Sequence, residues 1–168
     1  MTKTKKIVIS GLMLALCLLL PFLTGQIQTF GRMLAPMHLP VLLAGFLAGP
    51  FYAAAIGFIA PLLRFVLFSM PPIFPVGIAM AFELLTYGLV VGIMMNLLKK
   101  KNIKNIFISL IIAMIAGRIV WSITMFIVLG GAFTLKMALT ASVINAIPGI
   151  ICQLIIIPPI VYKLKDRI

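Results

Sequence analysis

Residues 74–95 read FPVGIAMAFELLTYGLVVGIMM, an apolar run long enough to cross a membrane as one helix, with Glu83 inside it. An ionisable side chain at membrane depth costs several kcal/mol unless a partner or a wet cavity receives it. Only one other acidic residue, Asp166, occurs in the chain, and it belongs to the charged C-terminal segment. The stretch therefore predicts a membrane helix and, within it, the first candidate for a functional residue.

The composition of the whole chain indicates the same class of protein. Of its 168 residues, 64% are hydrophobic and 10% are charged, which is too few charges to cover a soluble domain of this size. We predict an integral membrane protein that forms a single domain over residues 1–168. Cys17 and Cys152 lie in apolar runs without metal-ligand spacing, so we expect buried small side chains, no metal site and no cofactor.

Windows of about 20 residues predict an all-α bundle of six transmembrane helices. The expected ranges are 7–24, 37–50, 52–69, 76–97, 105–128 and 137–162. Only the Ala48-Gly49-Pro50 turn separates the second helix from the third, so one long span is the alternative there. The N-terminus starts with basic residues, as signal peptides do, but its apolar run is long enough to span, and we expect it to be retained.

Lysine and arginine near the ends of spans indicate orientation, because they concentrate on the cytoplasmic side. Three basic clusters flank the predicted helices: Lys3, Lys5 and Lys6; Lys99, Lys100, Lys101 and Lys104; and Lys163, Lys165 and Arg167. They share one side only if four helices precede Lys99 and two follow it, which predicts that both termini are cytoplasmic. This orientation accounts for most of the net charge of +12, so we expect no nucleic acid partner.

The other polar residues concentrate in the predicted extracellular half of the bundle. The candidate substrate-binding residues are Arg32, His38, Arg64, Glu83, Tyr87, Arg118, Trp121 and Asn145. Glu83 and Tyr87 are four residues apart, so they share one face of their helix. A water-accessible pocket that opens to the outside explains this concentration.

Structural roles compete with the pocket interpretation. A Glu–Arg pair between helices can serve packing or insertion alone, Trp121 can belong to an interfacial aromatic belt, and His38 can cap the start of its helix. For Glu83 and Arg118 we favour the pocket, because ionisable groups inside membranes are functional by default. For His38, Tyr87 and Asn145 both roles remain open.

Small residues recur at four-residue spacing, which lets helices approach closely in lipid. The pairs are Gly11 with Ala15, Gly45 with Gly49, and Gly88 with Gly92. We expect the last two pairs to pack inside the bundle. Gly11 and Ala15 lie on a terminal helix, where such a stripe can equally dock a partner subunit.

Taken in order, these features resemble the substrate-binding S components of energy-coupling factor (ECF) vitamin transporters. The resemblance rests on the basic start followed by the small-residue stripe, on MHLPVLLAGFLAGPFYAAAIG (37–57) and on FELLTYGLVVGIM (82–94). It covers essentially the whole chain. The family usually has Ala-xxx-Ala on its first helix, where this chain has Gly11 and Ala15.

The resemblance implies a subunit of the bacterial plasma membrane that binds a vitamin or related micronutrient tightly from outside, between helices four to six and under two external loops. It also implies docking, through Gly11 and Ala15, on a transmembrane coupling protein and two ATPases. Three arginines favour a substrate with a carboxylate or phosphate, such as pantothenate. If Glu83 neutralises one of them, a pyridoxine-like compound fits equally well.

Two other classes of function remain open. A proton-coupled carrier that works alone would use Glu83 as its proton site. An intramembrane enzyme with Glu83 and His38 as acid and base is disfavoured, because the chain has one histidine and no metal or nucleophile motif. The Gly-rich loop with a Lys-Ser/Thr ending that binds ATP is also missing from the sequence, so energy must come from another protein or an ion gradient.

Overall fold

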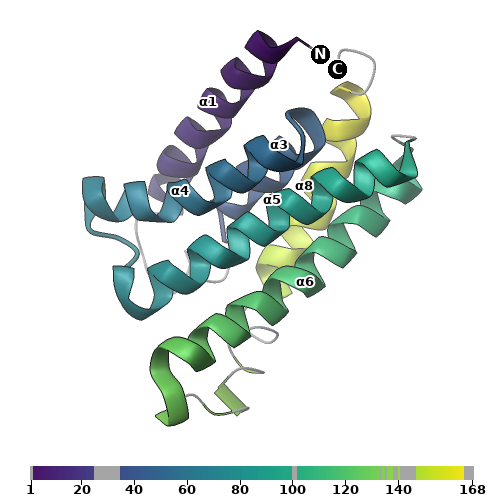
Figure 1. Cartoon of the computed structure of the whole chain (residues 1–168). Helices are drawn as coiled ribbons and strands as arrows, with labels where there is room; N and C mark the ends of the chain where they lie inside the picture. Colours follow the sequence, from purple (N-terminus) through teal and green to yellow (C-terminus); the bar gives the residue numbers. More distant parts are fainter. Residues whose placement is uncertain are drawn as a thin grey trace.

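The computed structural model describes residues 2–24, 35–99, 102–132, 134, 136–137, 140 and 147–164. Within these residues the chain is helical (Figure 1). The main helices are α1 (Lys3–Leu19), α3 (His38–Leu47), α4 (Pro50–Phe68), α5 (Ile78–Leu98), α6 (Ile103–Leu129) and α8 (Ile147–Leu164). Short helical turns adjoin three of them: η1 (Leu20–Thr24), η2 (Ile73–Gly77) and η3 (Gly130–Ala132).

Five of the described helices are long and apolar enough to cross a membrane. They are Lys3–Phe22, Pro50–Phe68, Ile73–Leu98, Ile103–Leu129 and Ile147–Leu164. The all-helical membrane class is therefore confirmed. The second predicted helix is present as α3, but its 10 residues extend about 15 Å, roughly half the hydrocarbon thickness.

The predicted ranges agree closely with three of the observed helices. The predictions 52–69, 76–97 and 105–128 each fall within two residues of the ends of α4, α5 and α6. α1 starts four residues earlier than predicted, because Thr2 caps it by accepting a hydrogen bond from the Lys5 amide at 3.4 Å. Most of the predicted start of the last helix, residues 137–146, lies outside the described residues.

The turn between α3 and α4 separates two helices rather than interrupting one long span. Gly49 has a φ of +99°, a conformation that costs a residue with a Cβ atom but not glycine. Pro50 then begins α4, where its missing N–H breaks no helical hydrogen bond. These two residues fold α3 back against α4, and the alternative of a single span is wrong.

Glycines allow α5 to pack closely against α3 and α4. A methyl group at Gly88 or Gly92 would come within 2.5 Å of the backbone of α4, at Ala53 and Pro50 respectively. One at Gly45 of α3 would lie 2.8 Å from the Val91 side chain. The predicted packing role of these three glycines is confirmed, whereas Gly49 serves the turn.

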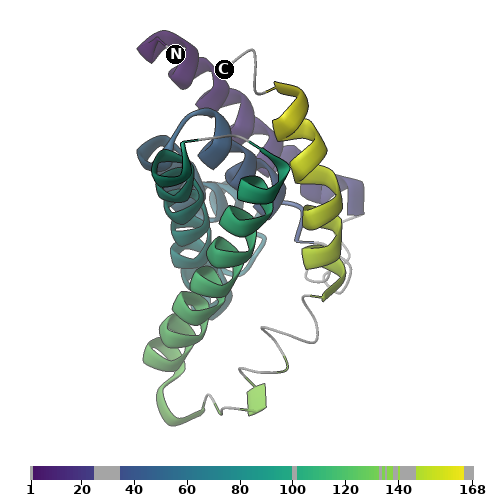
Figure 2. The ribbon, with the colours of Figure 1, turned by 90° about the vertical axis from the view of Figure 1, so that its right-hand side faces the viewer.

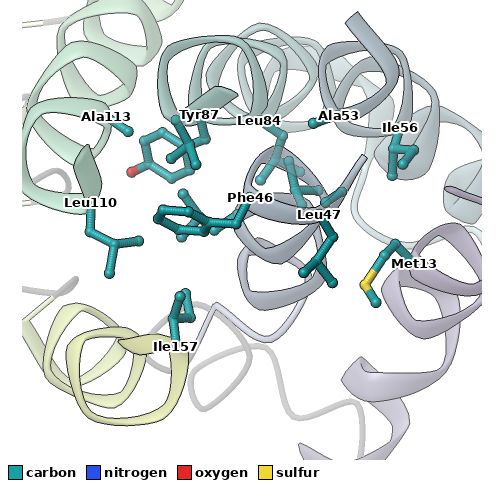
Figure 3. Close-up of a cluster of buried hydrophobic side chains, with 14 of the residues drawn as sticks. Met13, Phe46, Leu47, Ala53, Ile56, Leu84, Tyr87, Leu110, Ala113 and Ile157 are labelled. Carbon is teal, nitrogen blue, oxygen red and sulfur yellow. The ribbon is translucent and has the colours of Figure 1, made fainter. Parts of the chain in front are cut away.

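The hydrophobic core surrounds α3, which packs against α1, α4, α5 and α8. Every residue of α3 except Leu39 and Leu43 is buried. Figure 3 shows side chains from the surrounding helices converging on Phe46 and Leu47 of α3. Because the surrounding helices separate α3 from lipid, the first residue of this short helix can be polar.

The helix ends sort into two groups. α1 starts, α5 ends, α6 starts and α8 ends at the same end of the bundle (Figures 1 and 2). The lysines of these four helix ends therefore lie together: Lys3, Lys5, Lys6, Lys99, Lys104 and Lys163. At the opposite end, α6 continues well beyond the start of α8 (Figure 2).

Candidate functional site

Glu83 lies on α5, five residues after the helix begins at Ile78, and is completely buried. Its Oε1 atom accepts a hydrogen bond from the Tyr87 hydroxyl at 3.0 Å and lies 3.0 Å from an Arg118 guanidinium nitrogen. Its Oε2 atom lies 3.6 Å from Nε2 of His38, slightly longer than a hydrogen bond. One carboxylate thus gathers side chains from α3, α5 and α6.

The local geometry of each helix explains these contacts. Tyr87 lies one turn after Glu83 on the same face of α5, as the four-residue spacing predicts. His38 is the first residue of α3, and its ring packs edge-on against the Tyr87 ring at a centroid distance of 5.3 Å. Arg118 reaches the carboxylate from α6. We call His38, Glu83, Tyr87 and Arg118 the Glu83 cluster.

The cluster lies in the half of the bundle opposite the lysines. Glu83 is near the start of α5, which is the end of that helix remote from Lys99. His38 likewise begins α3, and Arg118 lies in the second half of α6. The sequence-based expectation that these polar groups share one half of the bundle agrees with this placement.

Gly117 is a further residue of this region, and the sequence reasoning missed it. A Cβ atom at Gly117 would overlap the ring of Tyr87, so the ring occupies the space that a side chain would fill. The Ala113-x-x-x-Gly117 spacing on α6 was a signal for such a close helix contact. Gly117 therefore allows the Tyr87 hydroxyl to reach Glu83.

Electrostatics make the cluster interdependent. Burying a carboxylate inside a membrane costs free energy, because the group loses its hydrogen bonds to water. It therefore requires protein partners that replace those hydrogen bonds. Arg118 supplies the opposite charge, and its side chain is 20% exposed against 2% for that of Glu83. Removing either charge leaves the other without compensation, which is more damaging than replacing both.

Arg64 is the other intramembrane arginine of the described chain, and it lies elsewhere. Its guanidinium donates a 2.5 Å hydrogen bond to the carbonyl of Leu18, near the end of α1. It also lies over the rings of Phe22 and Phe68, at 4.9 and 5.3 Å from their centroids. These contacts give Arg64 a structural role in holding α1 to α4, and its predicted part in substrate binding stays a prediction.

The remaining predicted site residues have different outcomes. Trp121 packs against Ala79 and Met125 in a second, smaller apolar cluster. Arg32 and Asn145 lie outside the described residues. Among the residues that are described, no group of three histidine, cysteine, aspartate or glutamate side chains is arranged to hold a metal ion.

The predicted docking stripe on α1 faces away from the bundle. Gly11 and Ala15 are exposed, and a Cβ atom built at Gly11 would have no atom within 4 Å. The opposite face of α1 carries the buried residues Met13 and Cys17. In contrast to Gly45, Gly88 and Gly92, Gly11 thus takes no part in close packing within the described part of the chain.

Comparison with known proteins identifies the family of the chain. The family model described as ECF transporter, substrate-specific component, matches residues 5–161. Searches of curated proteins and of solved structures each gave no significant match. The family match includes all four members of the Glu83 cluster and the α1 stripe. The chain belongs to the substrate-specific components of ECF transporters, which are transport subunits of the membrane.

Proposed function

We propose that this chain captures a vitamin or related micronutrient from the extracellular side of a bacterial plasma membrane and that the Glu83 cluster binds it. The convergence of three helices on one buried carboxylate supports this proposal. Such an arrangement is costly in a membrane and is characteristically retained where a solute is recognised. Family membership supports a role in substrate specificity.

The orientation follows from the distribution of lysines. The lysines at the ends of α1, α5, α6 and α8 lie at one end of the bundle, which we assign to the cytoplasm. Both termini are then cytoplasmic, and the Glu83 cluster lies in the outer half. We count α3 as the sixth helix of this single-domain bundle, although it is short.

Transport requires an energy source that the sequence lacks. The exposed stripe of Gly11 and Ala15 offers a surface on which another membrane helix can pack closely. We assign it to the transmembrane coupling protein of an ECF module, which carries two ATPases. For the substrate, pantothenate and a pyridoxine-like compound are the two candidates.

Mass spectrometry of the purified chain tests the proposed function. We expect a micronutrient to co-purify with the protein and to rebind in a detergent titration. Glu83→Ala and Arg118→Ala should each weaken rebinding by roughly ten- to hundredfold, equivalent to about 1.5–3 kcal/mol for a lost charge-assisted hydrogen bond.

Thr86→Val is the matched control on the same helix. The Thr86 hydroxyl donates to the Phe82 carbonyl of its own helix at 2.8 Å and takes no part in the Glu83 cluster. Its removal should leave affinity unchanged. Equal affinities for all three variants and the unmodified protein would show that the ligand binds elsewhere.

A further inference from the structure

The Glu83 cluster contains polar atoms whose hydrogen bonds are not made within the described chain. Nε of Arg118 is buried and has no hydrogen-bond partner there, and neither has Nδ1 or Nε2 of His38, although the His38 side chain is 95% buried (5% exposed). Buried polar groups in native proteins are almost always paired. These atoms therefore indicate the chemistry of a ligand that would complete the cluster.

The guanidinium of Arg118 uses only part of its hydrogen-bonding capacity. One terminal nitrogen faces Glu83 at 3.0 Å, and the N–H of Nε belongs to a different edge of the planar group. The edge formed by Nε–H and the second terminal nitrogen can donate two parallel hydrogen bonds to two oxygens of one carboxylate or phosphate, which is the bidentate mode of recognition. Because the guanidinium is positively charged, its N–H groups form stronger hydrogen bonds with an anionic acceptor than with a neutral acceptor.

Only one carboxylate competes for the donors of the cluster. Glu83 lies beside one terminal nitrogen of Arg118, while Nε of Arg118 and both ring nitrogens of His38 have no hydrogen-bond partner within the described chain. Arg64 lies outside the cluster, where its guanidinium contacts the Leu18 carbonyl and two phenyl rings. An acidic group of a ligand in the cluster would therefore meet the charged donor of Arg118, which binds an anionic acceptor strongly.

We propose that the solute recognised by the Glu83 cluster is an anion whose carboxylate or phosphate accepts hydrogen bonds from the Nε edge of Arg118, with His38 as a second donor. This inference rests on the proposed binding function and selects the acidic class of substrate over neutral pyridoxine-like compounds.

A fractionated metabolite extract tests the ligand class before the compound itself is identified. Yeast extract below 1 kDa is separated on an anion exchanger at pH 7 into a bound and an unbound fraction. Each fraction is added to protein purified from cells grown in minimal medium, and the midpoint of thermal unfolding is measured. We expect the bound fraction to raise the midpoint and the unbound fraction to leave it unchanged.

Alkaline phosphatase then distinguishes the two acidic groups. Treating the bound fraction with this enzyme abolishes the shift of the unfolding midpoint if the group is a phosphate and preserves it if the group is a carboxylate.

The other outcomes are distinguishable. A shift that the unbound fraction produces equally or alone overturns the anionic assignment and leaves the binding function intact. A shift from neither fraction contradicts both the assignment and the binding function.

Conservative variants test the role of Arg118 itself. Arg118→Lys keeps a positive charge beside Glu83 but lacks the Nε edge, so we expect it to need roughly tenfold or more of the bound fraction for the same shift. Thr124→Val is the control on the same helix and should respond like the unmodified protein, because the Thr124 hydroxyl donates to the Val120 carbonyl of its own helix. If Arg118→Lys is too unstable to purify, His38→Phe tests the second donor instead, because it keeps an aromatic ring beside Tyr87 but has no N–H group. An undiminished response of the purified variant, Arg118→Lys or His38→Phe, overturns the proposal.

Discussion

At the scale of single residues, Glu83 depends on partners from three helices. The hydroxyl of Tyr87 and the guanidinium of Arg118 share Oε1, while His38 faces Oε2. Because these groups meet on one carboxylate, a change that moves any of them alters the hydrogen bonds of the others. The most sensitive of these positions is the Tyr87 ring, which lies directly on the backbone of Gly117.

We expect Gly117→Ala to impair both stability and ligand binding. The added methyl group would overlap the Tyr87 ring and force α5 and α6 apart or turn the ring away from Glu83. Overpacking of this kind costs about 1–3 kcal/mol. Thermal unfolding and ligand titration in detergent measure the two effects.

Gly11→Ala is the control for the helix propensity of the new residue. Alanine has a higher helix propensity than glycine, so this effect is the same at both positions. Unlike Gly117, however, Gly11 has open space around it. Its substitution should therefore not destabilise the isolated chain and should raise its stability by up to about 1 kcal/mol. Similar behaviour of the two variants would contradict the close contact at Gly117.

At the scale of elements, α1 differs from the other helices in how little of it is buried. Its described contacts inside the chain are with α3, α4 and η1, and its small-residue stripe points outward. The inner face and Arg64 attach it to the bundle, while the outer face remains available. α1 can therefore serve two contacts at once, one within the chain and one with a partner.

We expect Gly11→Trp to abolish energised uptake while ligand binding to the isolated protein is retained. A large side chain on the stripe would hold a partner helix away from α1. The measurements are uptake in cells that carry the ECF module and equilibrium binding to purified protein. Ile115→Trp places the same bulk on an exposed position of α6 and should leave both intact. Full uptake by Gly11→Trp would locate the docking surface elsewhere.

Arg64 provides a second prediction about α1. Arg64→Met removes the hydrogen bond to the Leu18 carbonyl and the contacts with the rings of Phe22 and Phe68. A hydrogen bond from a charged group is worth about 1.5–3 kcal/mol, so we expect a lower unfolding midpoint. Hydrogen exchange should also become faster at the end of α1. Unchanged exchange there would mean that the Arg64 contacts do not hold the helix.

At the scale of the whole molecule, the separation between the lysines and the Glu83 cluster gives the protein two chemically different ends. Lysines at the ends of α1, α5, α6 and α8 mark one end, and the cluster lies in the other half. This polarity matches a subunit that receives a solute on one side of the membrane and releases it on the other.

The orientation can be tested by cysteine labelling in intact cells. The native cysteines are first removed by Cys17→Ala and Cys152→Ala. A membrane-impermeant maleimide should then label Thr134→Cys directly, because Thr134 follows the end of α6 that is opposite to Lys104. It should label Lys104→Cys only after the cells are permeabilised, because Lys104 lies at the end that we assign to the cytoplasm. The reverse pattern would invert the topology and place the Glu83 cluster in the inner half.

Much of the architecture was determined by local sequence. The apolar runs predicted α4, α5 and α6 to within two residues, because a helix in lipid must satisfy its own backbone hydrogen bonds wherever the run is long enough. The contact between Glu83 and Tyr87 followed from their spacing on one helix. The separation of α3 from α4 depended on the turn at Gly49 and Pro50, which the sequence predicted but did not distinguish from one long span.

Only the tertiary structure decided which arginine meets the buried carboxylate. Arg64 and Arg118 both lie in apolar runs in the predicted outer half, and although the sequence favoured Arg118 for the pocket, it did not show which of the two contacts Glu83. Their surroundings differ because Gly117 brings α6 close to Tyr87 and so places Arg118 beside Glu83, whereas α4 directs Arg64 to Leu18. Hydropathy determines how deep a side chain lies, but helix rotation and the distance between helices, which depend on contacts far apart in sequence, determine its partner.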